Sequence, residues 1–367
     1  MFEVTINSTT MAELKNFLQT MKFTDKVFLV SNKDTSYFFF GEPPVPVEGV
    51  FLLNGSIHDG DLMVCLNVKQ IIASIDSAVN TINLAFPDET YVEITIDGQT
   101  KINLSAVTPD EDTYEPVHES ILGYINSLKT KNTETVDYTE MAEMVSHLVP
   151  ADKAGAVNAI DILSLGRQVK FGSNSHLAIV TNSVFNNEDV SVTRYFLSCL
   201  KRITKTEDDI TILVDTSDEN MVFVKSKHTI FATTVMGVKF MEVGGILDSD
   251  AQSDVTFAPE QIASFNTEID RLKIPLIGVQ DPHIMFTVSD NSVNLYSKDL
   301  ANRISTSNVP FDSVTKIIDE HIAVKLSSIS NVIKDTLGDS VVFRIHESFV
   351  EIKYDHVSQI ISRYIMV

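Results

Sequence analysis

The sequence predicts an α+β fold made of three tandem domains, each built from two βαβββ units. A strand-like run, one helix and three alternating runs occupy the last stretch, residues 323–367. The same order of helix and alternating runs recurs at residues 68–107 and 194–235. Three further helical patterns precede these segments, which gives a repeat of about 120 residues, and internal repetition of this kind predicts a repeated architecture.

The last repeat shows the pattern most clearly. Its helix carries apolar residues at the three- and four-residue spacing of one helix face, namely Ile329, Val332, Ile333 and Leu337. Gly338 is expected to end this helix. Alternating runs at residues 341–345, 349–354 and 359–365 then predict three antiparallel strands joined by short turns.

The remaining helices follow from the same spacing. They are predicted at residues 10–22, 68–79, 139–148, 194–203 and 259–272. In the second of them, Val79 is expected on the apolar face. The domains are predicted at residues 1–116, 132–243 and 254–367, with connections at 117–131 and 244–253. A short extra helix is expected within residues 119–129.

The composition favours a soluble protein of a reducing cytoplasm. The chain has 367 residues, of which 44% are hydrophobic, so it can form several cores. Two cysteines, Cys65 and Cys199, are too few for a disulfide framework. The sequence shows neither a secretion signal nor an apolar run of membrane-spanning length.

The net charge of -22 argues against tight binding of nucleic acid, because phosphate binding depends on Lys and Arg. The basic residues nevertheless recur on the polar faces of the predicted helices. An ordinary solvated face explains any one helix, but the repetition suggests a shared basic surface. Its members are Lys15, Lys22, Lys69, Arg194, Lys201, Arg202, Arg271 and Lys334.

The sequence carries no strong catalytic or cofactor motif, such as a nucleophile elbow, a phosphate-binding glycine loop or a paired CxxC. The histidines are scattered, and His147 and His176 fall in or beside predicted elements, where structural roles are common. The spacing of residues 58–61 (HDGD) matches no metal-binding loop and indicates a turn. We therefore predict no enzymatic activity, no cofactor and no metal site.

Three segments resemble the bacterial-type (beta) DNA polymerase sliding clamps. Residues 168–179 resemble the family's strand, TDGHRLA-type turn and following strand, with Leu177 and Ala178 matching outright. Residues 240–247 (FMEVGGIL) resemble the FP[DE]Y-like link between the family's second and third domains. Residues 91–105 stand where the family has the last hairpin of its first domain. We interpret the chain as a divergent member, with a phage as a candidate source.

This resemblance implies a processivity factor that works as a head-to-tail homodimer. Two chains of three domains would close a ring around double-stranded DNA, with helices inside and sheets outside. A topological link needs no tight neutralisation of phosphate, so an acidic chain with a few basic residues on its inner helices is compatible with sequence-independent sliding. The expected partners are DNA, a DNA polymerase and a clamp loader, in the cytoplasm of a bacterial or infected cell.

The resemblance also implies two protein-binding surfaces. The first is an apolar cleft for short partner peptides, carried over by position to Gly172, Ser175, His176, Leu177, Met241, Ile246, Ile365, Met366 and Val367. The family usually continues beyond this point with a longer tail. The second is the dimer interface, where edge strands pair and Ile102 and Leu104 of one chain face Leu272 and Ile274 of the other. The alternative for both sets is ordinary core packing.

Two other classes of protein remain open from the sequence. A non-catalytic, β-rich structural protein would use the duplicated domains to build a lattice or shell. An enzyme would need a deep pocket with several convergent acids, which the sequence does not indicate. A ring of three two-domain subunits is disfavoured, because three pairs of repeats are present.

Overall fold

The computed structural model describes residues 2–20, 25–31, 36–41, 47–53, 62–88, 90–108, 123, 128, 131–148, 162–173, 176–216, 220–240, 243–247, 249–334, 336 and 340–364. These residues form two compact units. Unit 1 comprises Met1–Ala142 and Tyr195–Val235, and unit 2 comprises Glu143–Arg194 and Met236–Val367. No helix of the described residues is long and apolar enough to span a membrane.

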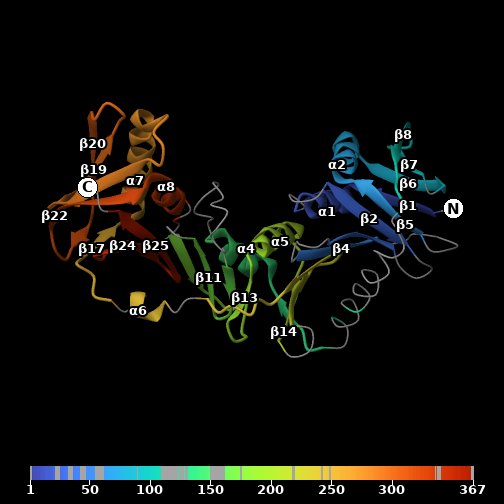
Figure 1. Cartoon of the computed structure of the whole chain (residues 1–367), viewed down its shortest axis with the longest axis horizontal. Helices are drawn as coiled ribbons and strands as arrows, with labels where there is room; N and C mark the ends of the chain where they lie inside the picture. The colour runs from blue at the N-terminus through green and yellow to red at the C-terminus, as the bar shows by residue number, and fades with distance from the viewer. Residues whose placement is uncertain are drawn as a thin grey trace. The chain divides into compact units, whose positions relative to one another are not determined.

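Unit 1 contains two antiparallel sheets (Figure 1). The first has the order β1-β6-β7-β8, with strands β1 (Phe2–Asn7), β6 (Thr81–Asp88), β7 (Tyr91–Ile96) and β8 (Thr100–Ser105). The second has the order β5-β2-β3-β4-β16-β15-β14-β9. Its strands are β2 (Lys26–Ser31), β3 (Ser36–Phe40), β4 (Val47–Leu53), β5 (Leu62–Asn67), β9 (Glu134–Val136), β14 (Ile210–Asp215), β15 (Met221–Lys225) and β16 (Thr229–Thr234).

Three helices of unit 1 pack together: α1 (Ser8–Leu18), α2 (Val68–Ser77) and α5 (Tyr195–Ile203), which leads into the turn η1 (Thr204–Thr206). α1 contacts both α2 and α5. α1 and α2 start in the same way, because Asn7 and Asn67 end a strand and accept hydrogen bonds from the backbone N–H groups of Thr10 and Gln70. α2 ends at Ser77, so Val79 lies beyond the helix and is 75% exposed, and its predicted place on the apolar face is wrong.

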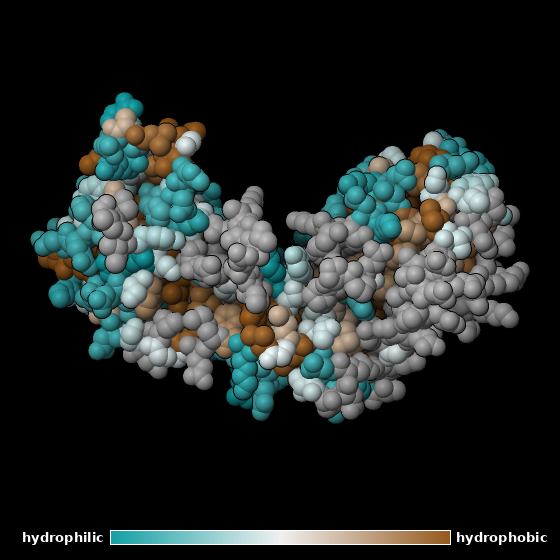
Figure 2. All heavy atoms as spheres, in the orientation of Figure 1, coloured by the Kyte–Doolittle hydropathy of each residue, from teal (hydrophilic) through white to brown (hydrophobic). Residues whose placement is uncertain are grey.

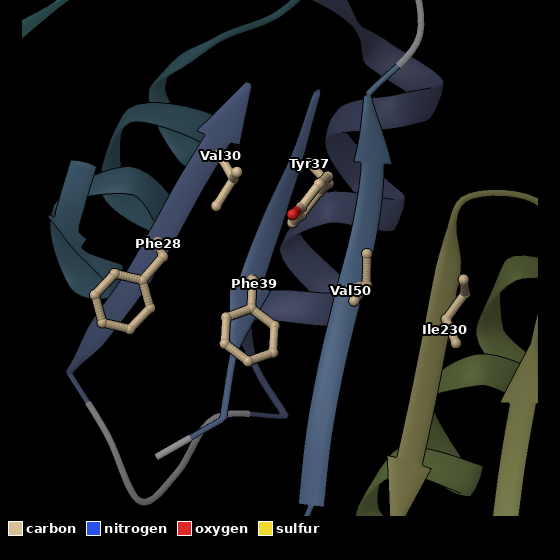
Figure 3. Close-up of a cluster of buried hydrophobic side chains, with 6 residues drawn as sticks. All are labelled: Phe28, Val30, Tyr37, Phe39, Val50 and Ile230. Carbon is tan, nitrogen blue, oxygen red and sulfur yellow. The ribbon is translucent and has the colours of Figure 1, made fainter. Parts of the chain in front are cut away.

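Aromatic side chains fill both faces of the larger sheet of unit 1. On the face toward α1, the ring of Phe17 lies 5.2–5.8 Å from those of Phe40, Phe51 and Phe231. On the opposite face, one buried cluster spans β2, β3, β4 and β16 (Figure 3). Its members are Phe28, Val30, Tyr37, Phe39, Val50 and Ile230. Leu128 packs against this cluster, so the predicted connection 117–131 contributes to the core.

Unit 2 contains one sheet of 13 strands, in which β13-β10-β11-β12-β25-β22-β18-β19-β20 form a continuous path. β17 pairs with β21 and β23, and β24 pairs with β23 and β25. Its first strands are β10 (Ile162–Leu165), β11 (Gln168–Ser173), β12 (His176–Thr181), β13 (Val190–Thr193), β17 (Ser253–Phe257) and β18 (His283–Val288). The others are β19 (Ser292–Lys298), β20 (Ile304–Pro310), β21 (Ser313–Val314), β22 (Ile318–Lys325), β23 (Val341–Ile345), β24 (Phe349–Tyr354) and β25 (Val357–Tyr364).

The helices of unit 2 include α7 (Pro259–Leu272), the turn η2 (Ile274–Leu276) and α8 (Leu326–Lys334). α7 and α8 contact each other (Figure 1). The short helix α6 (Gly244–Leu247) occupies part of the predicted connection 244–253. α4 (Tyr138–Ser146) begins in unit 1 and continues into unit 2.

All six predicted helices and the three closing strands are confirmed. The extra helix expected in residues 119–129 and the stop signal Gly338 lie mostly or wholly outside the described residues. The second predicted domain, residues 132–243, is divided between the two compact units. Its strand β16 pairs with β4 in unit 1, whereas its strand β12 pairs with β25 in unit 2. The three-domain boundaries therefore stay a prediction from the sequence repeat.

Candidate functional site

The helices of unit 1 present four of the predicted basic residues. Lys15 on α1 forms an ion pair with Asp76 on α2. Arg202 on α5 donates a hydrogen bond of 3.1 Å to the Gln19 side chain, one residue past α1. These two cations therefore help to join neighbouring helices.

The other two cations of unit 1 lie at the beginning of α2 and the end of α5. Lys69 lies 2.9 Å from the carboxylate of Asp25, and this pair is well exposed. Lys201 is half-buried in the last turn of α5. Lys22 lies outside the described residues. An exposed pair such as Lys69–Asp25 contributes little to stability, so its cation stays accessible to an anion.

The helices of unit 2 use basic residues in the same way. The amino group of Lys334 on α8 lies 3.8 Å from the carboxylate of Asp270 on α7. Lys273, just beyond α7, also binds Asp270 and donates a hydrogen bond of 2.6 Å to Ser330 on α8. The hydrogen bond from Lys273 holds the pKa of Asp270 below its usual range, and Lys334 adds to this effect. The carboxylate therefore stays charged between the two helices.

Two more predicted cations belong to unit 2. Arg271, in the last turn of α7, is exposed and pairs with Glu268 on the same helix. Arg194 is exposed immediately before α5. The described basic residues thus lie on or next to five helices, α1, α2 and α5 in one unit and α7 and α8 in the other, and most of them have an acidic or amide neighbour. Such a surface has a weak net field and favours loose contacts with phosphate.

An apolar cluster lies where β12 and β25 meet the segment 240–247 of unit 2. Leu177, Ile179, Val243 and Ile360 are its buried members. Phe240, Leu247 and Phe349 are partly buried and pack against them. We call these seven residues the β12–β25 cluster. Large hydrophobic side chains that stay partly exposed together are typical of a surface that binds another molecule.

A pocket of about 690 Å³ adjoins the β12–β25 cluster and shares Ile179 and Leu247 with it. The other lining residues are mostly polar or charged, among them Gln168, Asp250, Arg344, Glu351, Lys353 and His356. The combination of an apolar wall with a few oriented polar groups is common in binding sites. Both charge signs are present, so the pocket can accept either a cation or an anion beside an apolar group.

Hydrogen bonds and ion pairs fix the wall of this pocket. Arg344 lies 3.1 Å from Glu351 and 3.5 Å from Asp254. Glu351, which is only 1% exposed, also accepts a hydrogen bond of 2.8 Å from Ser358. Burial lowers the pKa of the neighbouring His346, and Arg344 lowers it further, so this imidazole is neutral at pH 7. The charged wall therefore has its geometry before any ligand arrives.

Some predicted cleft residues belong to this region and others do not. Leu177 is a member of the cluster, and a Cβ on Gly172 would lie 3.3 Å from Leu177 Cδ1 and 3.5 Å from Phe240 Cζ. His176 is only 3% exposed, and its Nε2 lies 2.7 Å from Gln359 Oε1. His176 therefore packs β12 against β25 and does not present its ring to a ligand. This agrees with ordinary core packing, the alternative to a place in the cleft.

The remaining predicted cleft residues cannot be placed. Ser175, Met241, Ile365, Met366 and Val367 lie outside the described residues, and only the backbone of Ile246 is described, in α6. The prediction missed Phe240 and Leu247, although both stand in the motif-like segment FMEVGGIL. It also missed Phe349, whose place beside the cluster depends on the pairing of β24 with β25.

The strands β8 and β20 each form one edge of their sheet, as several other described strands also do. β8 pairs only with β7, and β20 pairs only with β19, among the strands described. Of the predicted interface residues, Leu104 and Leu272 are 8% and 4% exposed, so they mainly fill their own cores, and Ile102 is half-buried. Ile274 is 67% exposed, Ile277 shortly after it is 79% exposed, and Ile304 at the start of β20 is 64% exposed.

The exposed isoleucines give unit 2 apolar surface at and near the edge strand β20. Figure 2 shows hydrophobic surface over the part of unit 2 where Figure 1 places α7 and β20. An exposed strand edge next to apolar side chains is a site where another strand can add to the sheet. The edge of β20 in unit 2 meets this description, whereas Leu104 beside the edge strand β8 of unit 1 is buried.

Neither protein-family models nor curated protein sequences match the chain. Solved structures match it over its whole length. The DNA polymerase III beta subunit of Borrelia burgdorferi aligns with a TM-score of 0.79 at 11% identity, covering 100% of both chains. The chain has the sliding-clamp fold. The beta subunit of Thermotoga maritima, with a TM-score of 0.77 at 14% identity, and the sliding clamp of Bacillus subtilis, with 0.74 at 11%, also cover 100% of both chains.

The sliding-clamp fold confirms the predicted α+β fold class and, at the level of the fold, the resemblance to sliding clamps, whereas the closed dimeric ring stays a prediction. Within this fold, strands far apart in sequence pair in both units, β4 with β16 in unit 1 and β12 with β25 in unit 2.

Proposed function

We propose that this chain is a processivity clamp, a non-catalytic protein that encircles double-stranded DNA and tethers a DNA polymerase. The observation that carries the proposal is the end-to-end match to beta subunits of DNA polymerase III, with both chains fully covered. The fold alone does not fix a function. The placement of three kinds of surface supports the proposal independently.

The basic residues on the helices supply the first surface. A ring that holds DNA topologically needs only weak, sequence-independent contacts, and paired cations such as Lys15 and Lys334 provide a weak field. The acidic net charge of -22 keeps DNA away from the rest of the molecule. The working site would be the cytoplasm of a bacterial cell or of an infected host.

The edges of β8 and β20 supply the second surface. We propose that β8 of one chain pairs with β20 of its partner and that two chains close a ring in this way. Ile274 would lie at this contact, because it is exposed and begins η2, which contacts β19 beside β20. A closed ring of two identical head-to-tail subunits contains two such contacts.

The β12–β25 cluster and its pocket supply the third surface. A short extended peptide with Leu or Phe side chains would place them on Leu247, Phe240 and Phe349, and a charged group of the peptide would enter the pocket. Peptides of this kind would come from the polymerase and from a clamp loader. Leu247 belongs to both the cluster and the pocket, so it should be central to affinity.

The first test combines particle mass with DNA topology. Light scattering should give a two-subunit particle for the wild type. After loading onto a nicked DNA circle, the protein should stay bound until the circle is cut and then leave over the free ends. An open-ended polymer, or retention that does not depend on DNA topology, would instead support the structural-protein alternative.

A matched pair of variants tests the proposed ring contact. Ile274→Asp places a charge on an exposed residue of the proposed interface and should give monomers that are not retained on circular DNA. Val238→Asp changes an apolar residue that is 49% exposed and lies outside the interface, and it should leave the dimer intact. Dimers of unchanged mass for Ile274→Asp would contradict the proposed contact.

A second pair tests the cleft by fluorescence anisotropy with a labelled synthetic peptide that contains Leu and Phe. Leu247→Asp should abolish binding, because it puts a carboxylate against the apolar cluster. Ile317→Asp changes an apolar residue that is 42% exposed, outside the cluster and pocket, and should bind as the wild type does. Equal affinity of the two variants would remove the cleft from the proposal.

A further inference from the structure

Three potential metal ligands converge in unit 2, beside the pocket but apart from the β12–β25 cluster. They are Glu143, His147 and His356, and their ligand atoms all lie within 4.8 Å of one another. His147 is only 6% exposed, whereas Glu143 and His356 are exposed. One ligand is thus anchored in the core, and the other two lie at the surface, where an ion can enter.

The end of α4 and the β24–β25 turn bring these three side chains together. Glu143 lies in the last turns of α4, and His147 follows four residues later, which places both on one side of the helix end. His356 lies in the turn between β24 and β25, which is tight because Asp355 has a φ of 44°. The rings of His147 and His356 are 5.9 Å apart and nearly perpendicular.

The buried ligand is oriented by neighbours that would not themselves bind the ion. The Tyr354 hydroxyl lies 3.3 Å from Nδ1 of His147, and the backbone carbonyl of His147 accepts a hydrogen bond of 2.8 Å from the Gln359 side chain. A second partner that fixes the ring and leaves the other nitrogen facing the metal is a regular feature of histidine metal sites. Nε2 of His147 would then be the ligand.

We propose that Glu143, His147 and His356 form a binding site for one divalent transition-metal ion, of which Zn²⁺ is the best fit. Two imidazoles with one carboxylate suit zinc, whereas Mg²⁺ and Ca²⁺ prefer all-oxygen sites. Ligands at about 2.0–2.1 Å from a tetrahedral ion lie roughly 3.3 Å apart. Binding would therefore require the two exposed side chains to move the ligand atoms closer than the observed 4.8 Å.

The ion would join the end of α4 to the β24–β25 turn. These segments are more than two hundred residues apart in sequence. A metal ion that binds both of them in the folded chain, and does not bind the unfolded chain, stabilises the folded state. His356 also lines the pocket, so the bound ion would form part of the pocket's edge. This proposal departs from the sequence-based prediction of no metal site, and it does not depend on the proposed clamp function.

The test uses the full, untagged chain stripped of metal by a chelator. Calorimetric titration with Zn²⁺ should give one ion per chain, and Co²⁺ should give the visible absorption of a four-coordinate site with nitrogen ligands. A saturating excess of Mg²⁺ should not compete. Zn²⁺ at 100 times its dissociation constant should stabilise the chain by about 2.7 kcal/mol, seen as a rise in melting temperature.

Variants at exposed positions keep the test independent of folding defects. His356→Ala and Glu143→Gln should each weaken Zn²⁺ affinity at least tenfold and remove the Co²⁺ spectrum. His321→Ala removes another exposed histidine of unit 2, on β22, and should bind as the wild type does. Tyr354→Phe removes only the hydroxyl beside His147 and should lower affinity about tenfold.

Two outcomes would overturn the proposal. One is a wild-type chain that binds no Zn²⁺. The other is a His356→Ala variant that binds Zn²⁺ as tightly as His321→Ala does, since the ion would then sit elsewhere. The site would be established if His356→Ala loses the Co²⁺ spectrum and His321→Ala keeps it.

Discussion

Two pairings of distant strands, one in each unit, use different kinds of side chain. In the unit 1 junction, the pairing of β4 with β16, Phe51 and Phe231 are fully buried and pack on α1 through Phe17. In the unit 2 junction, the pairing of β12 with β25, buried His176 and Gln359 hydrogen-bond to each other. The strand pairing is antiparallel in both.

The difference affects what each junction can do. Aromatic side chains pack closely on both faces of the larger sheet of unit 1. Such a core stabilises the fold through the apolar area that it buries. The unit 2 junction combines a directional hydrogen-bond network with apolar side chains that stay partly exposed, and it carries the pocket. The unit 1 junction thus consists of closely packed aromatic rings, whereas the unit 2 junction leaves a pocket and partly exposed apolar side chains beside it.

The largest expected effect comes from opening the closely packed junction of unit 1. Phe231→Ala should lower the free energy of unfolding by about 3–5 kcal/mol, because the ring is fully buried and its removal leaves a cavity. Chemical denaturation of the purified variant measures this loss. Phe231→Leu keeps most of the volume and should lose much less. A loss below about 1 kcal/mol for the alanine variant would show that the junction is not closely packed.

A smaller loss is expected from overfilling the same junction. A Cβ at Gly49 on β4 would lie 2.2 Å from Phe40 Cε1 and 2.9 Å from Phe17 Cε2, so Gly49→Ala must displace buried rings. The expected loss is about 2–3 kcal/mol. Gly237→Ala is the control, because no atom lies within 4 Å of its added Cβ. Equal denaturation midpoints for the two variants would mean that the rings can move aside without loss.

The polar junction should respond through its hydrogen bonds. Gln359 is fully buried, binds the ring of His176 and donates to the carbonyl of His147. Gln359→Ala leaves both groups unsatisfied and should lower the free energy of unfolding by about 2 kcal/mol. Gln280→Ala, at an exposed position of unit 2, serves as control. No difference between these variants would indicate that water replaces the amide.

The smallest expected effect is a gain in stability. Glu13 on α1 is 7% exposed, and its Oε2 lies 3.9 Å from Nε2 of His228, whose ring stacks on Phe51 of the unit 1 junction. Burial raises the pKa of Glu13, and His228 opposes this rise. The pKa of Glu13 in the folded state lies above its ordinary value of 4.5. The wild type therefore loses stability as the pH rises from 4.5 through the folded-state pKa, because the buried carboxyl must then ionise.

Glu13→Gln removes this ionisation and should raise the free energy of unfolding by about 1 kcal/mol at pH 7. This value is the low end of the free energy that an unpartnered buried polar atom costs. The advantage should disappear as the pH falls below 4.5, where the wild-type carboxyl is protonated in both states. Denaturation at several pH values measures it. Glu188→Gln, at an exposed position, should show no such trend. An advantage that does not change with pH would exclude ionisation as its cause.

Local patterns in the sequence predicted what depends on neighbours in the chain. The helix expected at residues 259–272 has those bounds, because Pro259 suits a first helical turn and the apolar spacing ends at Leu272. The alternating runs after α8 became β23, β24 and β25 for the same reason. Apolar spacing alone could not separate Leu272, which is buried, from Ile274, which is exposed two residues later.

The sequence by itself determined the α+β repeat, the six helices and the hairpins, since these follow from periodicity and turn residues over short distances. Only the tertiary structure decided that β4 pairs with β16 and β12 with β25, because strand pairing between residues so far apart depends on the packing of whole sheets. That pairing places Phe349 beside the β12–β25 cluster and brings His356 to Glu143 and His147. The repeat is therefore a local property of the sequence, whereas the candidate sites depend on long-range contacts.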